Sequence, residues 1–115
     1  MNKEESTRQL KVSRQIQKDI AEIIRLKGMA VFSGAMVTVS GVRITPDLSL
    51  ARVFISVFPS SKREDAMAVL TENSRTIRGE LGAKVSKQLR IVPELEFMSD
   101  DSLDYIEHID NLLKG

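Results

Sequence analysis

Two short stretches with the residue pattern of β-strands, separated by a turn, place the strongest constraint on the fold of this chain. The first, residues 37–44, reads VTVSGVRI, and its apolar positions change from odd to even numbers at Ser40-Gly41. One extra residue in a strand produces such a change, which predicts a bulge or bend at Gly41 that keeps both halves facing the core. The second, residues 51–58, follows the turn TPDLS and is apolar on both sides, as is typical of a central strand. The two stretches therefore predict a hairpin whose second strand lies in the middle of a sheet.

An amphipathic helix is predicted before this hairpin. Between positions 12 and 24 the apolar residues recur at steps of 4, 4, 3 and 1, which places them on one side of a helix. The helix is expected to start near a Ser6 or Thr7 cap and to end by Gly28. The next residues, GMAVFSGAM, are apolar without a helical period and indicate a loop packed on the core.

Helical periodicity returns after the hairpin and continues for about 27 residues. Ser61 and Glu64 match the N-cap and N3 positions of a capping box, which predicts the helix start. The apolar stripe is interrupted at Asn73-Ser74-Arg75, where Asn and Ser compete for backbone hydrogen bonds, so a kink between two helices is predicted there. The sequence GELG at 79–82 matches the G-x-x-G with which KH domains clamp a nucleic-acid backbone. Too few residues follow it for a second helix, so we interpret it as a coincidence within that helix and move the clamp question to the kink.

The remaining residues predict one more strand and one more helix. Residues 89–97, LRIVPELEF, alternate again, and Pro93 places this strand at a sheet edge because proline lacks the N–H donor. Residues 102–113 predict a short amphipathic helix with one face docked. A helical crossover permits a parallel pair, so we expect an α+β fold with a three-stranded mixed sheet in order 1-2-3 and helices on one face. This is the plan of a type II KH-like fold, in a single domain of residues 1–115 with its core at about 8–113.

Charge is unevenly distributed, although the whole chain carries only +1. Residues 3–27 contain seven basic against four acidic residues, 75–90 contain five against one, and 100–115 contain one against five. A dipolar molecule would turn its basic side toward a polyanion. The alternative is a solvated helix face, which is favoured for 3–27 alone because acids are interspersed there. The residues expected to contact RNA phosphates are Arg8, Lys11, Arg14, Lys18, Arg25, Arg75, Arg78, Lys84, Lys87 and Arg90.

Other functional classes find little support in the sequence. There is no cysteine, the only histidine is His108, and no nucleotide-binding, hydrolase or metalloprotease motif occurs, so we expect neither an enzyme nor a cofactor or metal site. No apolar run is long enough to span a membrane and no signal peptide is indicated, so a cytoplasmic protein without a small-molecule substrate is expected. Phe54 and Phe58 are candidates for base stacking, but partial burial under a loop is favoured for both.

A succession of motifs resembles the ribosome-binding factor A family of bacterial small-subunit assembly factors and covers roughly residues 8–113. The matching residues are Ser40-Gly41-Val42, Asp47-Leu48, Ala51 with Val53, Ile77-Arg78, Leu81-Gly82, the run LRIVPEL from Leu89 to Leu95, Phe97 and Asp101-Ser102. The resemblance implies a monomeric, non-catalytic factor that binds the free, immature 30S subunit and its 16S rRNA. It also implies a part in late maturation, in processing of the 16S 5′ end and in growth in the cold. The alternative is a protein-interaction module that makes no contact with RNA.

The chain departs from the family pattern in three places. The family's Asp-Pro-Arg after the first helix is replaced by KGMAVFSG, and its Ala-x-Gly at the kink by Asn73-Ser74-Arg75. About two extra residues stand between Gly82 and Leu89. At the kink, the replacement of the family's glycine by Arg75 adds a cation at the corner between the two helices.

Overall fold

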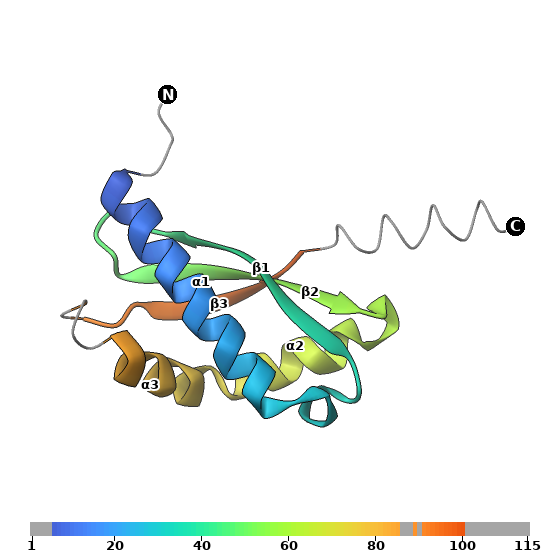
Figure 1. Cartoon of the computed structure of the whole chain (residues 1–115). Coiled ribbons are helices and arrows are strands. Elements are labelled where there is room, and N and C mark those ends of the chain that lie inside the picture. Colours follow the sequence, from blue (N-terminus) through green and yellow to red (C-terminus); the bar gives the residue numbers. More distant parts are fainter. Residues whose placement is uncertain (1–5, 86–88, 90, 101–115) are drawn as a thin grey trace, which may run out of the picture.

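The computed structural model describes residues 6–85, 89 and 91–100 of the chain (Figure 1). Three strands form one sheet in the order β1-β2-β3, in which β1 and β2 are antiparallel and β2 and β3 are parallel. The elements in chain order are α1 (Thr7–Lys27), the 3₁₀ helix η1 (Met29–Phe32), β1 (Met36–Ile44), β2 (Leu50–Phe58), the 3₁₀ helix η2 (Ser60–Lys62), α2 (Arg63–Glu72), α3 (Ser74–Val85) and β3 (Glu94–Ser99). The predicted α+β fold with a three-stranded mixed sheet is confirmed.

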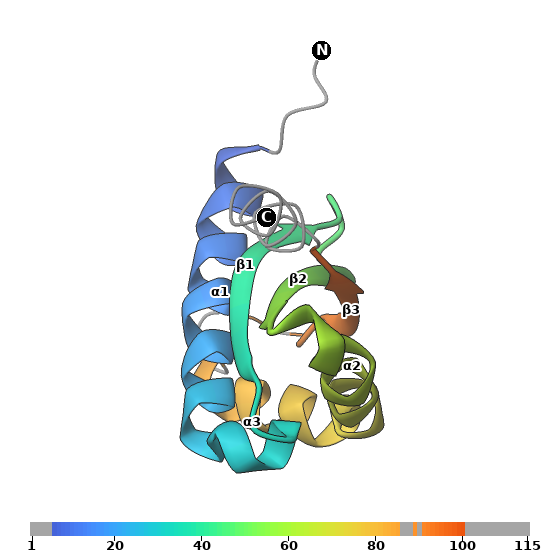
Figure 2. The same cartoon turned by 90° about the vertical axis from the view of Figure 1, so that its right-hand side faces the viewer.

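One hydrophobic core joins the three helices to one face of the sheet. Alternate residues of β2, namely Ala51, Val53 and Ile55, are fully buried there. The fully buried residues that the helices bring to them are Ile16, Ile20, Phe32, Ala66, Leu70, Ile77, Leu81 and Val85. Figure 2 shows β2 between the other two strands, where its apolar sequence predicts it to be. The opposite side of the sheet, here called the open face, is covered by no helix among the described residues.

The bulge predicted in β1 is present. Val39 pairs with Ile55 and Gly41 pairs with Phe54, so Ser40 is the extra residue between two consecutive pairs. Without it, a strand of strict period 2 would turn one half of its apolar residues to the open face. Val39 and Val42 are instead both buried in the core.

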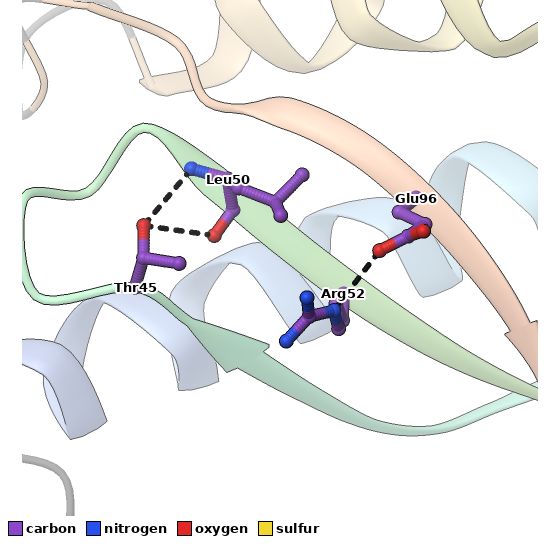
Figure 3. Close-up of polar contacts among 4 residues, drawn as sticks. All are labelled: Thr45, Leu50, Arg52 and Glu96. Carbon is purple, nitrogen blue, oxygen red and sulfur yellow. Dashed lines mark hydrogen bonds and ion pairs between the residues drawn. The ribbon is translucent and has the colours of Figure 1, made fainter.

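The hairpin turn between β1 and β2 is held by its own side chains. The Thr45 hydroxyl accepts from the Leu50 N–H at 3.1 Å, and its oxygen lies 3.4 Å from the Leu50 carbonyl oxygen (Figure 3). The Asp47 carboxylate accepts hydrogen bonds from the Ser49 and Thr45 hydroxyls and the Ser49 N–H, and these bonds lower the pKa of Asp47. The turn also needs Leu48 in the left-handed region, with φ of 62°. The polar side chains of Thr45, Asp47 and Ser49 therefore form their hydrogen bonds within the turn itself.

Both predicted ends of the first helix are confirmed. Ser6 is the N-cap of α1 and exchanges hydrogen bonds with Gln9 in a capping box. Gly28 ends the helix with φ of 84°, a backbone conformation that glycine adopts without steric cost. The loop that follows continues as η1 and buries Phe32, so the apolar segment after the helix does pack on the core.

The capping box predicted at Ser61 and Glu64 is wrong. The residues Ser60–Lys62 form η2, and the N-cap of α2 is Lys62, with no side-chain hydrogen bond to the cap. The Lys62 N–H donates to the Pro59 carbonyl, so Ser61 already lies inside a helical turn. A residue in that position is not placed to accept from the N–H groups of the following helix.

The third strand is shorter than its sequence pattern predicts. It begins at Glu94, whose N–H donates to the Ser49 carbonyl, and the described residues before it, 89 and 91–93, are not part of it. β2 starts at Leu50, which pairs with Glu94. Residues that precede Glu94 therefore have no residue of β2 with which to pair. Ile91, expected on a strand face, is consequently one of the most exposed apolar residues. The edge position of the strand is confirmed.

The helical break lies within the predicted segment, because α2 ends at Glu72 and α3 begins at Ser74. GELG lies inside α3, as interpreted from the sequence. The helix predicted for 102–113 lies outside the described residues.

The two glycines of GELG provide a matched test of packing. A methyl group added at Gly79 meets no atom within 4 Å, whereas one added at Gly82 lies 3.1 Å from Val92 Cγ2. We expect Gly79→Ala to raise the free energy of unfolding by about 0.5–1 kcal/mol, because alanine loses less backbone entropy in a helix. Gly82→Ala should gain less, because the new contact opposes the same entropic benefit. Urea unfolding of both variants measures the difference, and an equal or larger gain for Gly82→Ala would contradict the close approach of Val92.

Candidate nucleic-acid interface

The outer side of α1 carries a row of cations. Lys11, Arg14, Lys18 and Arg25 follow one another at steps of three, four and seven residues, so they share one side of the helix. All four are exposed, while Ile16 and its neighbours on the opposite side fill the core. Arg8 stands one turn before Lys11 and is also exposed. The five residues Arg8, Lys11, Arg14, Lys18 and Arg25 are called the α1 cationic stripe below.

Most of this stripe has no acidic partner within the part of the chain that the structure describes. Arg25 lies 3.6 Å from Glu22 in an exposed pair. The carboxylate of Asp19, which is next to Lys18 in sequence, accepts both its hydrogen bonds from the Gln15 amide at 3.1 Å. The remaining stripe residues therefore keep their charge available for an external anion.

The described basic residues of the second segment, Arg75, Arg78 and Lys84, do not form one surface. Glu80 pairs with Lys27 of α1 at 3.4 Å, which shows that this side of α3 faces α1. Lys84 follows Glu80 by one turn on the same side and is exposed. Arg75 is exposed at the start of α3, and Lys87 and Arg90 lie outside the described residues. Among the described basic residues of this segment, Lys84 is the one placed to extend the α1 cationic stripe.

Arg78 has an internal role that its charge did not reveal. Its guanidinium donates to the carbonyl of Val92 at 2.6 Å and to that of Pro93 at 3.0 Å. The Pro93 side chain is fully buried, and β3 starts at the next residue. The side chain of Arg78 therefore ties α3 to the segment that leads into β3.

A groove of about 490 Å³ lies between α1 and the end of α3. Its described lining consists of Arg8, Lys11, Val12, Gln15, Ile16, Val85 and Leu89. Arg8 and Lys11 of the α1 cationic stripe, together with Gln15, thus border a partly apolar floor. The groove makes this basic surface concave, so a convex part of a folded polyanion could fit against it.

The corner between α2 and α3 is closed by Asn73. Its backbone N–H and its side-chain amide both donate to the Val69 carbonyl, at 3.0 and 2.8 Å. The Asn73 carbonyl in turn accepts from the Ile77 N–H at 2.8 Å. A single residue therefore makes the corner that a G-x-x-G loop makes in KH domains, and Ser74 already belongs to α3.

The open face of the sheet offers a different surface. Phe54 is half-buried and Phe58 is 45% exposed on this face. Farther along, Arg52 pairs with Glu96 at 2.9 Å, which neutralises its charge (Figure 3). This face is therefore less cationic than the outer side of α1. In the described residues, no group of three or more metal-ligating side chains occurs, and no helix is long and apolar enough to cross a membrane.

Comparison with known proteins decides the family. The family model for ribosome-binding factor A matches residues 8–113. The chain belongs to the ribosome-binding factor A family. The ribosome-binding factor A of Christiangramia forsetii is 40% identical over 116 residues, covering 97% of this chain and 86% of that protein.

Solved structures of ribosome-binding factor A share the fold. The crystal structure from Thermus thermophilus aligns with a TM-score of 0.67 at 27% identity, covering 79% of this chain and 94% of that one. A homology model of the Thermus thermophilus protein, fitted into a cryo-electron microscopy map of its complex with the 30S subunit, aligns with a TM-score of 0.59. Its identity is 24%, over 77% of this chain and 91% of that one.

The internal role of Arg78 can be separated from RNA contact by stability. Arg78→Ala leaves two carbonyl groups without their charged donor and should lower the free energy of unfolding by about 1–3 kcal/mol. Lys84→Ala, on an exposed side of the same helix, should change it by less than about 0.5 kcal/mol. Chemical unfolding followed by circular dichroism measures both values. Equal stability of the two variants would show that the Arg78 bonds contribute nothing to the fold.

Proposed function

We propose that this protein is a non-catalytic assembly factor that binds the free, immature 30S subunit and its 16S rRNA. In this role it promotes late maturation of the subunit and processing of the 16S 5′ end. It acts as a monomer in the cytoplasm and needs no cofactor. Membership of the ribosome-binding factor A family supports the proposal, as does the 30S complex of the Thermus thermophilus relative.

The observation that carries the proposal is the α1 cationic stripe. Lysine and arginine side chains on a rigid helix, turned away from the core and largely unpaired among the described residues, match the phosphates of a folded RNA in charge. The positions of Lys84 and the adjoining groove extend this surface toward α3. Phosphate contacts of this kind recognise the shape of the RNA more than its base sequence.

The competing function is a protein-interaction adaptor without RNA contact. The exposed apolar residues of the open face favour it, because such residues are suited to a protein partner. The two functions differ in what ribonuclease does to a complex isolated from cell extract. Contacts that survive ribonuclease and high salt belong to the adaptor, and contacts that are lost belong to the assembly factor.

Binding to purified small subunits should depend steeply on salt. If about four phosphates are neutralised, the logarithm of the association constant should fall against the logarithm of salt concentration with a slope of about −3. Sedimentation of the protein with free 30S subunits across a salt series measures this slope. A flat response would remove the electrostatic account, whatever the affinity.

Single-charge variants locate the surface. Lys18→Ala should reduce the magnitude of the salt slope by about 1, because one phosphate contact is lost. Arg43→Ala removes the same charge from an exposed residue of the open face and should leave the slope unchanged. The same sedimentation assay compares the two. If Arg43→Ala has the larger effect, the RNA lies on the open face and the assignment to α1 is wrong.

A further inference from the structure

A small hollow lies where α1 ends. It has a volume of about 190 Å³ and is enclosed by the last turns of α1, the η1 loop and the start of β1. This is the end of the domain opposite the β1–β2 turn (Figure 1). The residues that line it are Ala21, Ile24, Arg25, Gly28, Met29, Phe32, Ala35, Met36 and Val37. This set is called the α1-end hollow below.

The α1-end hollow is apolar, with one cation at its border. Ile24, Phe32 and Ala35 are buried and form its floor. Met29 and Met36 stand at its rim, and their side chains are 54% and 55% exposed. Methionine is flexible and polarisable, so it packs against flat or irregular apolar groups. The hollow therefore offers an apolar contact surface that the core of the protein does not use.

The loop that forms one wall of the hollow is fixed. The Met29 carbonyl accepts from the Gly34 N–H at 2.9 Å, and the Lys62 ammonium donates to the Ser33 carbonyl. Ser33 lies in the left-handed region with φ of 60°, which a residue other than glycine keeps only where its surroundings hold it. The wall is thus formed before a ligand arrives, which reduces the entropy lost on binding.

We infer that the α1-end hollow receives one unpaired base of the RNA whose phosphates lie along the α1 cationic stripe. Arg25 belongs to both surfaces, because it is the last residue of the stripe and also lines the hollow. Its side chain is 71% exposed, and its contact with Glu22 at 3.6 Å is an exposed pair of the weak kind. A planar guanidinium in this position can bind the phosphate of a nucleotide or stack on its ring.

The size and polarity of the hollow suit a base. Its 190 Å³ is less than the roughly 300–1,000 Å³ of a pocket for a drug-sized molecule, so it suits a single ring system. The faces of a base are apolar and can pack on the floor, while its edge carries N–H donors. The last carbonyls of α1 give this end of the helix a partial negative charge, which favours such donors and disfavours a phosphate or carboxylate inside the hollow.

The adjoining charge favours RNA over a protein side chain. An aliphatic side chain of a protein would fill the apolar floor but would leave Arg25 without an anionic partner. A nucleotide supplies the base for the hollow and the phosphate for Arg25 in one unit. The inference rests on the proposed function and adds to it a preference for unpaired RNA, since a base inside a duplex is not free to enter the hollow.

Binding of single-stranded and double-stranded RNA by the full-length protein tests the inference. Ala21 is exposed on the α1 wall of the hollow, and Ala21→Leu fills the hollow without changing the charge. This variant should bind a short single-stranded RNA of mixed sequence about fivefold or more weakly, since one stacked base is lost. Its affinity for the same RNA annealed to its complement should be unchanged. Fluorescence anisotropy of the labelled RNA measures both affinities.

Three further measurements keep the test specific. Met29→Ser removes a rim side chain from a different element and should cause a loss of the same kind. Ala68→Leu makes the matched change at an exposed alanine of α2 and should have no effect. The salt slope of Ala21→Leu should equal that of the unmodified protein, in contrast to Lys18→Ala, because no phosphate contact is removed. Circular dichroism verifies that each variant is folded.

Several results would overturn the inference. They are an unchanged affinity of Ala21→Leu for single-stranded RNA, an equal loss for single-stranded and duplex RNA, and an equal loss in Ala68→Leu. Weaker binding of Ala21→Leu to 30S subunits, with unchanged affinity for single-stranded RNA, would assign the hollow to a protein side chain instead. The proposed function fails by a different result, a flat salt response of the unmodified protein with 30S subunits. A steep response together with an inactive Ala21→Leu change rejects the hollow alone.

Discussion

The buried central strand β2 is the constraint on which the rest of the structure depends. Its core-facing residues Ala51, Val53 and Ile55 have no exposed surface, and both of its edges are paired. A shift of one residue in either pairing would turn apolar residues of the partner strand to the open face. The extra residue Ser40 lets β1 keep a core-facing register along its full length. Every helix then has one defined apolar surface on which to pack.

This arrangement also explains why the candidate interface lies on the outer side of α1. The isoleucines of the helix are all used against the sheet, so its other side is free to carry charge without cost to the core. A helix held along one complete side presents its cations at fixed spacing, which loses less side-chain and backbone entropy on binding than a loop would. In the described part of the second basic segment, Arg78 donates to carbonyl groups inside the fold, and Glu80 pairs with Lys27 of α1.

Features that show in the pattern of neighbouring residues could be predicted from the sequence. Features that depend on contacts between residues far apart in the chain could not. The change of parity at Ser40, the apolar β2 and the weak point at Asn73 are each visible within a few residues. The capping box at Ser61 failed because a turn that starts at Pro59 takes that residue into a helical conformation. The role of Arg78 was missed because its acceptors are carbonyl groups 14 and 15 residues away, which no side-chain pattern reveals. Of the candidate site, the row on α1 follows from helical spacing, whereas the separation of Arg75, Arg78 and Lys84 required the packing of α3.

The parallel pairing of β2 with β3 joins residues far apart in the chain, such as Leu50 and Glu94. The β1–β2 hairpin closes a much shorter loop, so it costs less conformational entropy and is favoured to form first. During synthesis from the N-terminus, the outer edge of β2 stays unpaired until residues 94–99 have been made. An unpaired edge of an apolar strand is a template for association with another chain. The last strand of the sheet therefore also protects the nascent protein from aggregation, and slow completion of translation lengthens the time for which that protection is missing.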